Sequence, residues 1–135
     1  MLRAKKIKFT AQPIVIGDLA MEYHKLSMPN EHIETYLLVS PQDFETLLTI
    51  HDKKESPYGI YVMDAAAVCY FLNWYGYNYE NVAPKAIKMK GKLIADKYTL
   101  LTMATLLAMD KKNKILKSTA KKYLADASII VNSLI

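Results

Sequence analysis

The stretch IETYLLVSPQDFETLLTIH, residues 33–51, carries the two clearest structural signals in this chain of 135 residues. In residues 33–39, one side of an extended backbone carries Ile33, Thr35, Leu37 and Val39, which predicts a β-strand. Residues 40–51 begin with Ser40, a favoured N-cap residue, and so predict a helix. A strand that leads directly into a helix indicates a domain in which sheet and helices pack together.

The start of this helix has further support. Pro41 suits the first helical position, because its missing N–H has no partner there in any helix. Asp43 stands three residues after Ser40, the spacing of a capping box. We therefore expect a helix that begins at residue 40 or 41.

Weaker patterns predict further strands and helices on both sides of residues 33–51. Alternating residues predict a strand over KKIKFT, residues 5–10, with an extension in PIVIGD, residues 13–18, after a break at Pro13. A short strand is expected over 60–63. Helices are expected over 18–28 with Asp18 as N-cap, over 65–75 with Asp64 as N-cap, over 92–110, and from residue 115 onward. Residues 52–59 are expected to form a loop, and residues 84–91 fit either a first helical turn or a strand.

This order of elements predicts an α/β or α+β fold in one domain, residues 1–135. It would have a small three-stranded sheet from the N-terminal half and a helical C-terminal half, with four to five helices in all. The connections between the strands are long enough for a parallel sheet, and an antiparallel sheet remains open.

Composition narrows the class of protein. Apolar residues make up 52% of the chain, which is typical of a globular protein. The single cysteine, Cys69, lies in the apolar run AAAVCYFL and indicates a buried, reduced thiol in a cytoplasmic protein. The N-terminus is a poor signal peptide, and no apolar stretch approaches the roughly 20 residues of a membrane span. We therefore expect no membrane partner.

Charge is strongly separated along the chain. Residues 17–84 hold three lysines against ten acidic residues, whereas residues 85–122 hold eleven lysines against two. Such separation favours a polyanionic partner or the association of opposite patches, and lysines that merely solvate helices would account for it equally well.

The stretch NWYGYNYENVAPKAIKMKGK, residues 73–92, concentrates aromatic and basic residues. Tyrosines can stack on bases and lysines can bind phosphates, so this stretch is a candidate nucleic-acid surface. We expect Trp74 to be at least partly buried and Tyr77 and Tyr79 to be more exposed. The full set of candidate nucleic-acid-binding residues is Tyr75, Tyr77, Tyr79, Lys85, Lys88, Lys90, Lys92, Lys117 and Lys121.

The C-terminal run SIIVNSLI suggests a second kind of surface. Ile129, Ile130 and Leu134 are candidate interface residues for a protein partner or a second copy of the chain, because one helix face cannot bury all the apolar residues of this run. The same region can be aligned as a helix-turn-helix with a turn at Asp126. A single helix explains the spacing with fewer assumptions, and it is the structure we expect.

No catalytic constellation, metal-ligand spacing or phosphate-binding glycine loop is evident, so no cofactor and no metal ion are expected. Two fragments, YVMDAAAVCYFL around Asp64 and YLADASIIVNSLI around Asp126, resemble segments of the PIN-type metal-dependent ribonucleases. That resemblance implies acids that gather Mg²⁺ for nuclease activity.

Three functions follow as hypotheses. The first is a non-enzymatic nucleic-acid-associated regulator or inhibitor of viral or mobile-element type. The second is a protein-interaction or assembly subunit that forms homo-oligomers. The third is a metal-dependent nuclease.

Overall fold

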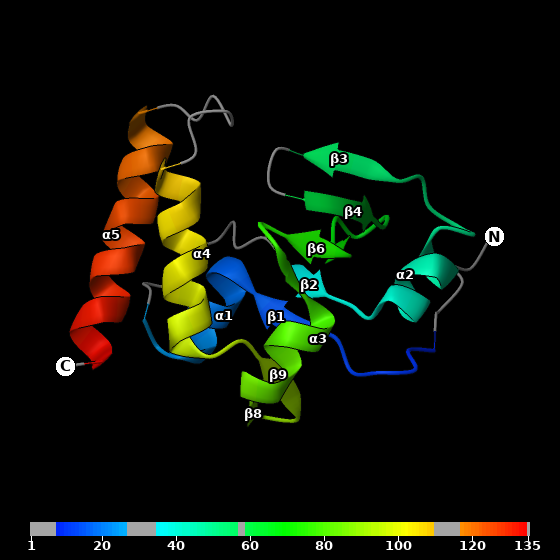
Figure 1. Cartoon of the computed structure of the whole chain (residues 1–135), viewed down its shortest axis with the longest axis horizontal. Helices are drawn as coiled ribbons and strands as arrows, with labels where there is room; N and C mark the ends of the chain where they lie inside the picture. The colour runs from blue at the N-terminus through cyan, green and yellow to red at the C-terminus, as the bar shows by residue number, and fades with distance from the viewer. Residues whose placement is uncertain (1–7, 27–34, 57–58, 110–116, 135) are drawn as a thin grey trace.

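The computed structural model describes residues 8–26, 35–56, 59–109 and 117–134 (Figure 1). Most of its strands belong to one sheet: β1 Ile14–Ile16, β2 Tyr36–Leu38, β3 Lys54–Ser56, β4 Gly59–Met63, β5 Cys69–Phe71, β8 Ile87–Met89 and β9 Lys92–Ile94. A second sheet pairs β6 Asn73–Trp74 with β7 Tyr77–Asn78.

The main sheet has seven strands in the order β3-β4-β5-β2-β1-β9-β8. The pairs β1–β9 and β2–β5 are parallel, and the other neighbouring pairs are antiparallel. The sheet is therefore mixed. The expected small three-stranded sheet is wrong, because four further strands of three residues each join the three that the sequence signalled.

The described residues form five α-helices. They are α1 Gly17–Tyr23, α2 Pro41–Leu47, α3 Tyr79–Val82, α4 Lys97–Met109 and α5 Lys117–Leu134, and a 3₁₀ turn, Ala83–Lys85, follows α3. In Figure 1, α4 and α5 lie side by side at one end of the molecule, α1 lies between them and the sheet, and α2 lies toward the other end. Since α5 is continuous, the single helix is confirmed over the helix-turn-helix.

The expected start of the helix after Ser40 is confirmed. The Ser40 Oγ accepts a hydrogen bond from the Asp43 backbone N–H at 3.2 Å, and Pro41 occupies the first turn. The helix ends at Leu47, earlier than expected. The other half of the capping box is absent from the described contacts, since the Asp43 carboxylate instead accepts from Thr10 and Ala11.

The expected helix over 65–75 is wrong. Asp64 does not cap a helix: its Oδ1 accepts hydrogen bonds from the N–H groups of Ala66 and Val68, which closes the turn between β4 and β5. Ala67 takes a positive φ of 62° in this turn. The aromatic and β-branched residues that follow are good strand formers, and β5 inserts between β4 and β2.

Two tight hairpins also went unpredicted. β6 and β7 are joined by Tyr75 and Gly76, and β8 and β9 by Lys90 and Gly91. All four connecting residues have positive φ, which fits the two-residue type I′ turn that matches the twist of paired strands. The ambiguous residues 84–91 thus resolve into the 3₁₀ turn and strand β8.

Other boundaries also needed correction. Residues 54–56 lie in β3 rather than in a loop, and Lys8–Thr10, the described part of the expected first strand, lie outside any strand. The helix α1 ends at Tyr23, with Asp18 in its first turn and Ile16 at the N-cap. Residues 27–28 and 33–34, where an expected helix ended and an expected strand began, lie outside the described residues.

The core follows from this topology. All three residues of β1 are buried, because the strand pairs on both edges and is covered on both faces. Phe71 of β5 is buried between two aromatic rings, with its centroid 5.2 Å from that of Tyr36 and 5.0 Å from that of Tyr61. A smaller apolar cluster of Val39, Phe44, Leu47 and Val62 joins α2 to the sheet.

Candidate nucleic-acid interface

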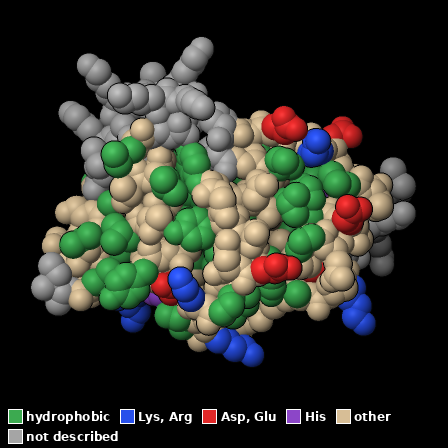
Figure 2. Space-filling model, in the orientation of Figure 1, with side chains coloured by type: hydrophobic (Ala, Val, Ile, Leu, Met, Phe, Trp, Pro, Cys, Tyr) green, Lys and Arg blue, Asp and Glu red, His purple; other side chains and the backbone are tan. Residues whose placement is uncertain are grey.

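Four of the candidate lysines lie together at one edge of the main sheet, in residues 85–92, which we call the lysine hairpin. The side chains of Lys85, Lys88, Lys90 and Lys92 are all exposed. No acidic residue occurs between Glu80 and Asp96, so no carboxylate within this stretch of sequence neutralises them. Figure 2 shows lysine side chains projecting from the lower edge of the molecule, where Figure 1 places β8 and β9.

The strand register sets the direction of each lysine. Lys88 pairs with Leu93, whereas Lys92 pairs with Met89, one position along the ladder. Because successive residues of a strand point to opposite faces, Lys88 and Lys92 project from opposite faces of the hairpin. Lys90 stands in the turn between them. The hairpin therefore carries positive charge on both faces and at its tip.

A short segment near the N-terminus, Thr10–Gln12, fastens this hairpin to two other elements, and we call it the strap. The Gln12 side-chain amide donates to the Gly91 carbonyl in the hairpin turn at 2.7 Å. The Tyr79 hydroxyl of α3 donates to the Gln12 carbonyl at 2.8 Å. The tip of the lysine hairpin is thus held by a hydrogen bond to Gln12, a residue far away in the sequence, which Tyr79 holds in turn.

The other end of the strap is held by Asp43 of α2. Its carboxylate accepts from the Thr10 N–H at 2.9 Å, the Thr10 hydroxyl at 3.0 Å and the Ala11 N–H at 3.2 Å, and the residue is buried. Burial opposes the charged form, but the hydrogen bonds from Thr10, Ala11 and Ser40 outweigh it and lower the pKa of Asp43 below its ordinary value.

We expect Asp43→Asn to lower the free energy of unfolding by about 2–4 kcal/mol at pH 7, since an amide NH₂ group cannot accept from both donor residues. The lowered pKa means that this contribution is present above about pH 4 and is lost as the pH falls through the folded-state pKa. Urea unfolding at pH 7 and pH 3 measures it: the difference between wild type and variant should shrink at pH 3.

Glu45→Gln is the matched control, because Glu45 is an exposed acid on the same helix. Equal stability of the Asp43 and Glu45 variants at pH 7 would contradict the role given to the Asp43 carboxylate.

The aromatic residues around the β6–β7 hairpin are less exposed to solvent than the lysines of the lysine hairpin. Trp74 is buried, as expected, although it lies in strand β6 and not in a helix. The expectation that Tyr77 and Tyr79 are more exposed than Trp74 is confirmed. Both are nevertheless half-buried and pack on the core, as does Tyr75. Burial, with the nearby charge of Asp43, raises the pKa of Tyr79, so its hydroxyl stays protonated and can donate to Gln12.

The remaining candidates are placed elsewhere. Lys117 and Lys121 lie on the first half of α5, where the side chains are outside the described part of the chain. Ile130 is fully buried in the chain's own core, and Leu134 is half-buried against that core. Ile129 is 40% exposed, so it is the interface candidate that a partner can reach.

The two acids of the nuclease resemblance do not meet in one described site. Asp64 uses its Oδ1 in the β4–β5 turn, and its Oδ2 accepts from the Tyr70 hydroxyl at 3.0 Å. Burial, followed by the interaction with Asp64, raises the pKa of Tyr70 to about 12. The segment after Asp64 is a turn and a strand, so the strand-to-helix feature that prompted the resemblance is missing.

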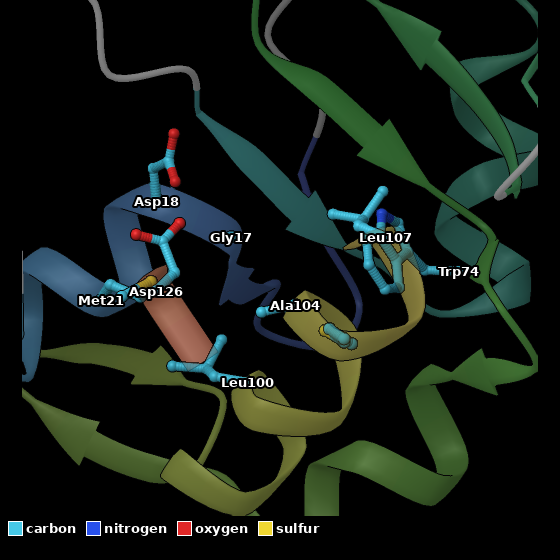
Figure 3. A pocket seen from close by; sticks show the side chains of 9 residues that line it. Gly17, Asp18, Met21, Trp74, Leu100, Ala104, Leu107 and Asp126 are labelled. Atoms are coloured by element: carbon cyan, nitrogen blue, oxygen red, sulfur yellow. The ribbon is translucent and has the colours of Figure 1, made fainter. Parts of the chain in front are cut away.

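Asp126 lies instead at a small pocket between α1, α4, α5 and β6 (Figure 3). Asp18 and Asp126 lie on one side of it and Trp74 and Leu107 on the other. The volume of about 30 Å³ accommodates one or two water molecules. No group of three or more His, Cys, Asp or Glu side chains with metal-binding geometry occurs among the described residues.

Sequence reasoning found the hairpin lysines but missed the strap. Gln12 and Gly91 are 79 positions apart, and no local pattern links them. The Lys90-Gly91 pair was a local signal for the hairpin turn alone, since a glycine between two short strands favours a tight turn.

No family model matches this chain, and no curated protein or solved structure is detectably similar to it. The part of the chain that the structure describes contains no helix with the length and hydropathy needed to cross a membrane.

Proposed function

We propose that this chain is a non-enzymatic nucleic-acid-associated protein that binds phosphates through the lysine hairpin. The observation that supports the proposal best is the group of four exposed lysines, Lys85, Lys88, Lys90 and Lys92, in a stretch without acidic residues. Phosphate contacts of this kind supply most of the affinity of sequence-independent binding.

The chemistry of the hairpin favours backbone recognition over base reading. A lysine ammonium is a point charge without the two-pronged geometry by which arginine recognises guanine. The half-buried tyrosines Tyr75, Tyr77 and Tyr79 offer only limited ring surface, so stacking on bases contributes less than the lysines do. The proposed role is that of a cytoplasmic regulator or inhibitor, which acts by covering the phosphates of the nucleic acid that it binds.

A salt titration tests this function directly. We expect the logarithm of the association constant for a mixed-sequence DNA duplex to fall linearly with the logarithm of salt concentration. Four lysine contacts predict a slope of about −3.6 for a duplex and about −2.8 for a single strand. Fluorescence anisotropy with a labelled 20-nucleotide probe measures both. A slope near zero, or no binding at 50 mM salt, would overturn the proposal.

Assembly through α5 is a second candidate function, favoured by the exposure of Ile129 and Val131 near the end of that helix. These residues are about 200° apart around the helix at 3.6 residues per turn, so they face different directions. A partner that covers Ile129 would remove an apolar side chain from water.

The substitution Ile129→Glu tests this second candidate. We expect a lower molar mass by light scattering if a partner copy covers Ile129, with the far-UV circular dichroism spectrum unchanged because the side chain lies outside the core. A folded monomer both before and after the substitution would exclude self-association through Ile129.

A further inference from the structure

The residue Gln12 stands just before the point where strand β1 begins to pair with strand β9. The two strands run parallel, with Ile14 level with Leu93. Two residues earlier in each strand, the same register sets Gln12 level with Gly91, in the turn of the lysine hairpin. Pro13, which precedes the first paired residue of β1, has no backbone N–H with which to extend the ladder.

The Gln12 side chain makes the connection that the backbone ladder does not reach. Its amide group donates to the Gly91 carbonyl at 2.7 Å, as one further rung beyond the paired residues. The β1–β9 pairing covers Leu93 and Ile94, so Lys92 and the turn extend beyond it. A Cβ atom at Gly91 would meet nothing within 4 Å, so the turn is open on that side. The hydrogen bond from Gln12 therefore holds a part of the hairpin that projects past β1.

The backbone of Gln12 is itself fixed from several directions. Two residues earlier, the Thr10 N–H donates to the carboxylate of Asp43. On the other side, Pro13 restricts the residue before it to an extended conformation. The Tyr79 hydroxyl donates to the Gln12 carbonyl at 2.8 Å. A side chain on such a fixed backbone loses less conformational entropy when it forms its hydrogen bond than one on a free loop.

The turn that Gln12 holds contains a strained residue. Lys90 has a φ of +50°, in the left-handed region that residues with a Cβ atom rarely adopt. The added hydrogen bond at Gly91 favours this turn over less strained conformations. It thereby fixes the directions in which Lys90 and Lys92 leave the hairpin.

We propose that Gln12 and Tyr79 are positioning residues of the lysine hairpin. Gln12 holds the turn and the Tyr79 hydroxyl holds Gln12, so that Lys90 and Lys92 meet phosphates from an ordered backbone. The inference rests on the proposed function, the binding of phosphates by this hairpin. It gives Tyr79 a role through its hydroxyl group, which differs from stacking of its ring on a base. An ordered turn loses less entropy on binding, so affinity rises without a further contact to the nucleic acid.

Gln12→Met tests the first residue, because methionine has a similar length and no donor. We expect its affinity for a mixed-sequence DNA duplex to fall about three- to tenfold at every salt concentration. The slope of log K against log salt should stay that of wild type, because the number of phosphate contacts is unchanged. Fluorescence anisotropy measures both. Gln42→Met is the matched control: Gln42 is exposed on α2, and this variant should bind like wild type.

Tyr79→Phe tests the second residue, since it removes the hydroxyl and keeps the ring. We expect a similar fall in affinity, again with the wild-type slope. Tyr98→Phe, at a tyrosine that is 66% exposed on α4, is the control and should bind like wild type. If Tyr79→Phe kept full affinity and Tyr79→Ala lost it, the ring and not the hydroxyl would be at work, and the positioning role of Tyr79 would be refuted.

The route through the lysines is tested by combining substitutions. In a Lys90→Gln/Lys92→Gln background, Gln12→Met should change the affinity less than about twofold, because residues that act through one another are not additive. A full three- to tenfold fall in that background would contradict a role exerted through Lys90 and Lys92.

Order in the turn can be measured without nucleic acid. Amide NMR relaxation of the wild-type protein should give the Gly91 N–H an order parameter of about 0.85, typical of rigid backbone, and Gln12→Met should lower it below about 0.6. An unchanged order parameter at Gly91 would overturn the inference whatever the protein binds.

The two proposals fail in different ways. No binding of the duplex by wild type would overturn the proposed function and this inference with it. Salt-dependent binding by wild type, with an equal affinity for Gln12→Met, would overturn this inference alone. A flattened slope for Gln12→Met would also overturn it, because Gln12 would then help to set the number of phosphate contacts.

Discussion

Replacing Gly59 with Ala is expected to lower the free energy of unfolding by about 3–5 kcal/mol. A Cβ atom at Gly59 would lie 2.1 Å from the backbone carbonyl oxygen of Asn73 and 3.1 Å from its side-chain oxygen. The first of these atoms belongs to the backbone of strand β6 and cannot rotate away. Strand β4 would have to move off β6.

Such a movement would break several hydrogen bonds at once. The Ile60 N–H donates to the Asn73 side-chain oxygen at 2.9 Å, and the Gly59 N–H donates to the Ser56 hydroxyl at 3.1 Å. The Ser56 hydroxyl in turn donates to the Gly59 carbonyl at 2.9 Å. The contact from Ile60 to Asn73 ties the β3–β4 hairpin to the second sheet, and the two contacts between Ser56 and Gly59 close the hairpin itself. The substitution therefore tests how the two sheets fit together.

Thermal unfolding followed by circular dichroism measures this effect. For a chain of this length the expected loss corresponds to a fall in Tm of about 10–20 °C. Gly76→Ala is the matched control: its φ is +83°, so the alanine is strained by about 1 kcal/mol, but nothing lies within 4 Å of the new Cβ. If Gly59→Ala unfolded at the same temperature as Gly76→Ala, the close approach of β4 to β6 would be refuted.

The parts of the fold that the sequence predicted are those with strong local signals. Ser40 and Pro41 mark the start of α2, and the regular apolar spacing after residue 115 marks α5 as one helix. The strands β1, β2 and β4 were expected because their apolar residues form recognisable runs. Each of these signals lies within one element.

The parts that were missed depend on contacts between elements. The strands β3, β5, β6, β7 and β9 have two or three residues each and are specified by their partners. Strand β8 was one of the two alternatives left open for residues 84–91. The alanine-rich run after Asp64 favours a helix locally, yet the Asp64 side chain closes a turn there and β5 gains two neighbouring strands. Tertiary pairing outweighed helix propensity.

The candidate site also has features that the sequence could predict and features that it could not. The exposure of the four hairpin lysines was predictable, since a lysine is rarely buried without a partner. The partial burial of the tyrosines was not predictable, because it depends on packing against residues distant in the sequence. The strap could not be predicted from the sequence, because its hydrogen bonds join Thr10 and Gln12 to residues 33 and 79 positions away.

Replacing all four hairpin lysines with Gln is expected to weaken nucleic-acid binding by about 10³-fold at 0.15 M salt. The estimate follows from counterion release, in which four lost phosphate contacts remove about 3.6 bound cations from the binding equilibrium. Folding should be unaffected, because Lys85, Lys88, Lys90 and Lys92 are all exposed. Fluorescence anisotropy measures the affinity, and circular dichroism checks the fold.

The effect on affinity of losing positive charge anywhere in the protein must be distinguished from the effect of losing the lysine hairpin. Lys53 and Lys54 provide the control, since they lie at or next to β3, at the edge of the main sheet opposite β8. The double variant Lys53→Gln/Lys54→Gln removes the same charge as Lys88→Gln/Lys90→Gln and leaves the lysine hairpin intact.

The salt dependence of duplex binding by these two double variants is the most direct test of the lysine hairpin. We predict that Lys88→Gln/Lys90→Gln flattens the slope of log K against log salt by about two units and weakens binding about thirtyfold at 0.15 M salt. Lys53→Gln/Lys54→Gln should keep the wild-type slope. Equal slopes for the two variants would contradict the account, because the charge of the whole protein, and not the lysine hairpin, would then determine binding.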